Sequence, residues 1–281
     1  MKHILLIFFM FISFQTNAAM KIVASYPPIQ SLVWSISEGI NPVSILINNN
    51  KQGHHDITLK PSQIKTLRQA DIVFWIDETL ENFMPEALKT NAPKALSVPL
   101  MKETKDLKLI EQNVEEQKFD VHFWLNPNNA KKMLETICTV LSEKDPKNAL
   151  RYQENKEKAL AYFDKLKDVQ KPDKNKKIIA FHNGFDYMND FFELNIQTAP
   201  FDIEKNTTPI TLKKLHDYLE TEKPHCILIE PGISRRQLKA LNLKKQPIVK
   251  MDAFGWNINN GPGQYYRMIN WNIKALRDCL K

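Results

Sequence analysis

The stretch KNALRYQENKEKALAYFDKLKDV, residues 147–169, decides how the chain is organised. Its residues are mostly good helix formers. Asp145 and Pro146 break the chain before it, and Pro172 follows it. The pattern predicts one long helix that acts as a rigid connector between the segments on either side. Apolar side chains recur along it at helical spacing, at Leu150, Tyr152, Ala159, Tyr162, Phe163 and Leu166.

Short β-branched runs alternate with helical stretches on both sides of this helix, as in parallel sheets built from βαβ units. We therefore predict an N-terminal α/β domain at 20–145, a connecting helix at 146–171 and a C-terminal α/β domain at 172–281. Residues 101–118 are charged, carry no strand signal and are predicted to be an exposed loop. The predicted strands are 22–24, 44–47, 72–75, 95–98, 178–181, 226–229 and 248–251. Helices are expected after Pro28, Pro61, Thr79 and Pro127, and at 185–192, 212–222 and 264–279.

The first 19 residues have the features of a secretory signal peptide. Lys2 and His3 precede an apolar run at 4–14 that is too short to span a bilayer, and small residues follow it. Cleavage is expected after Ala18 or Ala19. No cysteine lies at this exit to accept a lipid, so we expect a mature chain that is free in a periplasm. An uncleaved membrane anchor is the alternative interpretation.

The formal net charge of +7 comes from lysines and acids that are interspersed along the chain. A nucleic-acid-binding protein would gather its basic residues on one face, so this class is not expected. No later apolar run is long enough to cross a membrane, which argues against a membrane-embedded mature chain. The pattern gives no reason to expect more than a monomer.

Three cysteines in an exported chain allow one disulfide and leave one thiol over. Cys226 begins an apolar strand, and Cys279 lies near the C-terminus, where a covalent bond would tie down the last helix. We predict a Cys226–Cys279 disulfide. Cys138 lies in a helical run and is expected to be a small buried residue.

Four histidines lie in predicted loops or at predicted strand ends: His54, His55, His122 and His182. The carboxyl ends of parallel strands meet at one edge, where α/β proteins gather ligands. Three imidazoles with an open or carboxylate-filled fourth position form an established zinc arrangement. Taken singly, each histidine is better explained by a local hydrogen bond, so the zinc interpretation depends on the histidines together. We assign no role to His216 or His225.

Two acids also follow predicted strands. Asp252 is either a fourth metal ligand, an acceptor that orients a ligand histidine, or a helix cap without a metal role. Glu230 is interpreted as mainly structural.

In this order, these residues resemble the metal-binding family of ABC-importer substrate-binding proteins, of the cluster A-I type, over nearly the whole mature chain. A ligand histidine six residues before a proline, an acid-spacer-histidine motif, a strand that ends in histidine and two late acids all have counterparts here. The matching segments are His55 to Pro61 with Ala70-Asp71, Asp120 to Pro127, His182 to Tyr187, Glu230-Pro231 and Asp252-Ala253.

The resemblance implies a metal site in the interdomain cleft, bound by His55, His122 and His182, with Asp252 as fourth ligand or orienting acceptor. His54 is a less favoured ligand. Zinc-type members have histidine at the third position, whereas manganese-type members have glutamate, so His182 favours zinc. Two departures stand out. Many zinc members carry a histidine-rich loop where residues 101–119 have no histidine, and Ala253 replaces the usual proline.

The resemblance therefore implies a periplasmic protein that is not an enzyme. It would capture Zn²⁺ and deliver it to the membrane permease and ATPase of an ABC importer. One alternative is a carrier of manganese or another divalent metal in the same family. A zinc-dependent hydrolase is disfavoured, because no HExxH or nucleophile-elbow motif is present. An adhesin is the third alternative.

Overall fold

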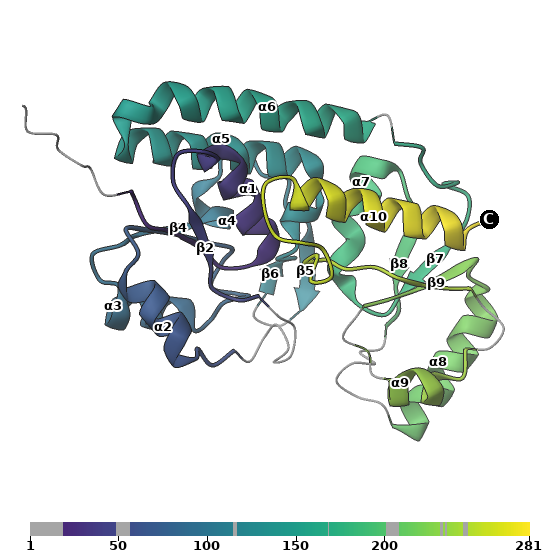
Figure 1. The fold of residues 1–281 in the computed structure, drawn as a ribbon. Coiled ribbons are helices and arrows are strands. Elements are labelled where there is room, and N and C mark those ends of the chain that lie inside the picture. Colours follow the sequence, from purple (N-terminus) through teal and green to yellow (C-terminus); the bar gives the residue numbers. More distant parts are fainter. Residues whose placement is uncertain are drawn as a thin grey trace, which may run out of the picture.

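A computed structural model describes residues 19–48, 57–114, 117–167, 169–200, 208–230, 233, 235–243 and 247–281, and Figure 1 shows its fold. Two four-stranded parallel sheets lie in the two halves of the chain. The predicted α/β architecture, with one long helix between two parallel-sheet halves, is confirmed. The domain boundaries stay predictions.

The first sheet has the strand order β2-β1-β3-β4, and all three strand pairs are parallel. Its central strands are continuous apolar runs, because helices and loops bury both of their faces. The strands are β1 (Ile22–Ala24), β2 (Val43–Ile45), β3 (Ile72–Trp75) and β4 (Leu96–Pro99). The helices are α1 (Pro27–Ser37), α2 (Pro61–Arg68), α3 (Met84–Asn91) and α4 (Leu100–Glu103). A proline near the start of α1, α2 and α3 presets the helical backbone.

The second sheet has the order β10-β9-β7-β8 and is also parallel throughout. The strands are β7 (Ile178–Ala180), β8 (Ile196–Thr198), β9 (Cys226–Ile229) and β10 (Ile248–Lys250). The helices are α7 (Asp186–Phe192), α8 (Pro209–Glu222), α9 (Arg235–Leu241) and α10 (Gln264–Cys279). No helix in the described ranges is long and apolar enough to cross a membrane.

The connecting helix α6 (Ala149–Lys167) follows α5 (Pro127–Lys144) after a short 3₁₀ turn, and the two helices lie side by side in Figure 1. Two side chains fasten α6 to the end of α1. The Arg151 guanidinium donates to the Gly39 carbonyl over 2.8 Å, and the Asn155 amide donates to the Ile36 carbonyl over 3.0 Å. The first turns of the helix are therefore docked on the N-terminal half, and further along Phe163 stacks on Tyr265 of α10, so the helix is not a free linker.

Helix α10 joins the two halves at its N-terminal end. The Tyr265 backbone N–H donates to Ser31 Oγ in α1, and the Tyr265 hydroxyl donates to the Trp124 carbonyl over 2.6 Å. One cluster of buried apolar side chains includes residues of both sheets, such as Val73 and Leu228. The halves thus share a core.

The structure corrects the prediction for residues 101–118. Instead of an open loop, this segment contains the end of α4 and strand β5 (Glu111–Val114), which pairs antiparallel with β6 (Gln117–Phe119). The strand was missed because its sequence, EQNV, is mostly polar and lacks the alternation typical of a half-buried strand.

The predicted disulfide is present. Cys226 and Cys279 are bonded, with their Cα atoms 5.9 Å apart, and this joins the start of β9 to the end of α10. Cys138 is a free, buried thiol, as expected.

Candidate metal centre

His122 lies between β6 and a short 3₁₀ helix, and only 4% of its surface is exposed. Asp120 Oδ1 is 2.7 Å from His122 Nδ1 and accepts the His122 backbone N–H over 2.9 Å. Because a carboxylate only accepts hydrogen bonds, we assign the ring proton to Nδ1. The lone pair of Nε2 is then available for a metal ion, and the ring orientation is fixed.

His182 follows β7 at the carboxyl edge of the second sheet, where the strand pattern placed it. Its Nε2 is 3.4 Å from His122 Nε2, and the two ring planes are perpendicular. Two Zn–N bonds of about 2.0–2.1 Å at a tetrahedral angle would separate their nitrogens by about 3.4 Å. The two imidazoles, one from each half of the chain, therefore have the spacing of two ligands to a single zinc ion.

Gly184, just after His182, makes room for this pair. A Cβ atom at this position would lie 2.9 Å from His182 Cδ2, closer than real Cβ contacts, and 3.3 Å from His122 Cδ2, which is tighter than most. Any larger residue would displace at least one ring. The importance of Gly184 left no local signal in the sequence, because the crowding comes partly from His122, which lies 62 positions earlier in the chain.

Two aromatic rings also pack around His122. The Trp124 ring lies 5.2 Å from the His122 ring, and the Phe254 ring lies 6.3 Å from it. Trp124 Nε1 donates to the Ala253 carbonyl over 2.9 Å, which fastens the loop after β10 to the Trp124 ring. Such an apolar surround strengthens the electrostatic interactions inside it.

Asp252 begins this loop and is 98% buried, given its exposed fraction of 2%. Its carboxylate accepts the backbone N–H groups of Phe254 and Gly255 over 3.0 and 2.8 Å, and that of Asn257 over 3.4 Å. Burial raises its pKa, while these backbone hydrogen bonds lower it. The carboxylate thus orders the loop that packs against His122. Its role as a metal ligand stays a prediction.

Asp186 is a further acid near the pair that sequence reasoning missed. Burial and the neighbouring charge of Asp120 raise its pKa to about 6, against a lowering by His122. It lies at the start of α7, four residues after His182 in the chain, so its closeness in sequence to the predicted ligand was the available signal.

Several predicted residues lie elsewhere. His54 and His55 are outside the described residues. Within the described ranges, no group of three or more His, Cys, Asp or Glu side chains could hold a metal ion. Glu230 is buried at the end of β9. The two histidines without an assigned role bond locally, His216 Nε2 to the Leu241 carbonyl and His225 Nδ1 to the Lys177 N–H.

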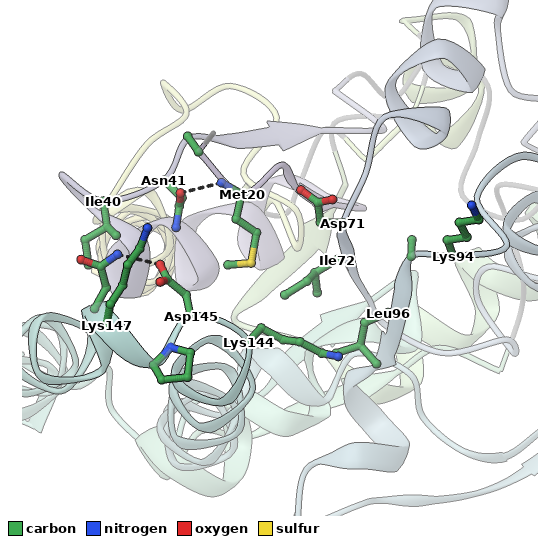
Figure 2. A pocket seen from close by; sticks show the side chains of 14 residues that line it. Met20, Ile40, Asn41, Asp71, Ile72, Lys94, Leu96, Lys144, Asp145 and Lys147 are labelled. Atoms are coloured by element: carbon green, nitrogen blue, oxygen red, sulfur yellow. Dashed lines mark hydrogen bonds between the residues drawn. The ribbon is translucent and has the colours of Figure 1, made fainter. Parts of the chain in front are cut away.

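A cavity of about 820 Å³ lies in the N-terminal half, and Figure 2 shows the side chains that line it. They include Met20, Asp71 and Leu96, which lie at or just before the N-terminal ends of β1, β3 and β4. The cavity is therefore at the edge of the sheet opposite to the one that gathers ligands in α/β proteins. Neither His122 nor His182 lines it.

Comparisons with known proteins identify the family and the fold of the chain. The sequence model of the family described as "ZnuA: Zinc-uptake complex component A periplasmic" matches residues 22–279. The high-affinity zinc uptake system protein ZnuA of Brucella abortus is 25% identical over 311 residues, which cover 92% of this chain and 91% of that protein. The iron ABC transporter substrate-binding lipoprotein MtsA of Streptococcus pyogenes is 25% identical, over 82% of this chain and 79% of that protein. A crystal structure of ZnuA superposes with a TM-score of 0.77 at 22% identity, over 93% of this chain and 98% of that one. Since the family model spans both sheets and the histidine pair between them, this chain belongs to the ZnuA family of periplasmic zinc-uptake components.

Proposed function

We propose that this protein captures Zn²⁺ in the periplasm and delivers it to the permease and ATPase of an ABC importer. The observation that carries the proposal is the His122–His182 pair, with 3.4 Å between the two Nε2 atoms. The Asp120 carboxylate behind His122 makes that imidazole a better donor. A carrier needs this preorganised, reversible site and no group that attacks a substrate.

The donor set supports zinc over harder cations. Imidazole nitrogen suits zinc, copper, nickel and iron, whereas carboxylate and water oxygens suit manganese and magnesium. His55 is proposed as the third ligand, with Asp252 as fourth ligand or orienting acceptor and His54 as a less favoured ligand. The iron-transporting relative makes iron the second candidate cargo.

The remaining parts of the proposal come from the sequence pattern. A signal peptide at 1–19 would release a chain without a lipid-bearing cysteine, unlike a lipoprotein. The mature protein would then act as a monomer with no enzymatic activity and no nucleic-acid partner. The N-terminal domain at 20–145, the connecting helix at 146–171 and the C-terminal domain at 172–281 complete this description.

The test is a competition titration of the metal-stripped mature protein against a chelator, with zinc, manganese, iron, copper and nickel. We expect one tightly bound zinc per chain and a large loss of affinity in His55→Ala, His122→Ala and His182→Ala. His216→Ala is the matched control, because its ring bonds to a backbone carbonyl away from the pair. No stoichiometric zinc, or equal binding by all four variants and the wild type, would contradict the proposal.

A further inference from the structure

Asn272 on α10 is fully buried, and its side-chain amide both accepts and donates a hydrogen bond. Its Oδ1 accepts the Asp252 backbone N–H, and its Nδ2 donates to the Asp252 backbone carbonyl, both over 3.0 Å. We infer that Asn272 is a positioning residue of the metal centre, which sets the Asp252 loop against His122. This inference rests on the proposed function.

The chain of contacts from Asn272 to the histidine pair is short. Its two hydrogen bonds fix the backbone of Asp252, whose carboxylate then orders the next residues through their N–H groups. The following residue, Ala253, accepts the Trp124 indole N–H, and the Phe254 ring packs 5.2 Å from Trp124 and 6.3 Å from His122. A displacement of the loop would therefore move the aromatic rings around the Nε2 donor of His122.

Helix α10 is a firm base for this role, because it is anchored on both sides of Asn272. Seven residues earlier, Tyr265 bonds to Ser31 of α1 and to the Trp124 carbonyl. Seven residues later, Cys279 is bonded covalently to Cys226 at the start of β9. The Asn272 amide thus transmits the position of a helix that is tied to both halves of the chain.

Two nearly isosteric substitutions separate the two hydrogen bonds. Asn272→Leu removes both and leaves the N–H and the carbonyl of Asp252 without these partners. Asn272→Asp keeps an acceptor for the N–H but turns a carboxylate oxygen toward the carbonyl oxygen, which repels it. A purely structural role would lower stability alone, whereas a positioning role also lowers zinc affinity at equal stability.

The controls are Ile273→Val and Leu276→Ala, which open a small and a large cavity at buried positions of α10 and leave the Asn272 side chain unchanged. We expect these two to retain wild-type zinc affinity within about twofold, and both Asn272 variants to bind zinc about tenfold or more weakly. Thermal melts place the four variants on one stability scale. If Asn272→Leu and Asn272→Asp do not fold, zinc affinity and stability are compared in Asn272→Ser instead, which keeps one hydroxyl.

Zinc affinity in the Asn272 variants equal to that of the wild type, or falling only in line with stability as in the controls, would overturn the inference. A wild-type protein that binds no zinc would instead contradict the proposed function. The chelator titration distinguishes the two failures, because it measures the wild type beside every variant.

Discussion

Replacing Asp120 by asparagine tests the metal centre with the smallest change in shape. The carboxylate accepts from His122 Nδ1 over 2.7 Å and from the His122 backbone N–H over 2.9 Å. An amide oxygen can accept both hydrogen bonds, but each loses its charge assistance, which is worth about 1 kcal/mol per bond. The backbone bond is the same with and without metal, so only the Nδ1 bond affects binding.

Loss of about 1 kcal/mol from the metal-bound state corresponds to roughly fivefold weaker zinc binding. We expect this result in a chelator competition assay at neutral pH. The matched control is Asp164→Asn, which removes the same charge from an exposed carboxylate of α6 that pairs with Lys131 of α5 and with Lys167. Zinc affinity that is unchanged in Asp120→Asn, or reduced as much in Asp164→Asn, would refute the idea that Asp120 acts through the His122 ring.

Three further outcomes follow from the geometry. Gly184→Ala places a Cβ atom 2.9 Å from the His182 ring and should displace that ring. Because metal–ligand distances tolerate changes of only about 0.2 Å, we expect roughly tenfold weaker zinc binding. An unchanged zinc affinity in the chelator assay would contradict this expectation. Reduction of the Cys226–Cys279 bond, which spans 53 residues, should lower the unfolding free energy by about 4 kcal/mol in urea titrations, and equal midpoints before and after reduction would count against it. Burial raises the pKa of Glu81 to about 8 from its ordinary 4.5, so its contribution to stability is full at acid pH and lost as pH rises through about 8. Between pH 5 and pH 8 the unfolding free energy of the wild type should fall by an amount on the order of 3 kcal/mol because of Glu81, and Glu81→Gln should not show this fall. Parallel profiles of unfolding free energy against pH in variant and wild type would exclude this role of Glu81.

The sequence predicted best those elements whose burial leaves a strong local pattern. Strands β1, β3 and β9 are unbroken apolar runs on both faces, and their predicted bounds match the structure. Strand β8 was missed, because it is three residues long and its middle residue, Gln197, is exposed. Helix α9 was also missed, because it is only seven residues long and its sequence, RRQLKAL, begins with polar residues and shows little apolar periodicity.

The part of the candidate site that lies at strand ends or within spaced motifs was predictable from the sequence. The expected approach of His122 and His182 is found in the structure, although 60 residues separate them. Phe254 and Asn272 could not be found in this way, because their importance comes from contacts with residues that are distant in the chain, and for Gly184 this is true in part. A local sequence pattern carries no signal for the Phe254 ring, which packs on His122, 132 positions earlier in the chain.

The apolar cluster shared by both sheets determines how the protein loses its structure. When one half melts, the other half loses side chains that complete its core, and the packing of α10 against α1 is lost. Heat or urea should therefore produce one cooperative transition, with equal calorimetric and van't Hoff enthalpies, rather than two separable ones. Either half produced alone would present a broad apolar face to water, so each half is expected to aggregate when it is expressed without the other.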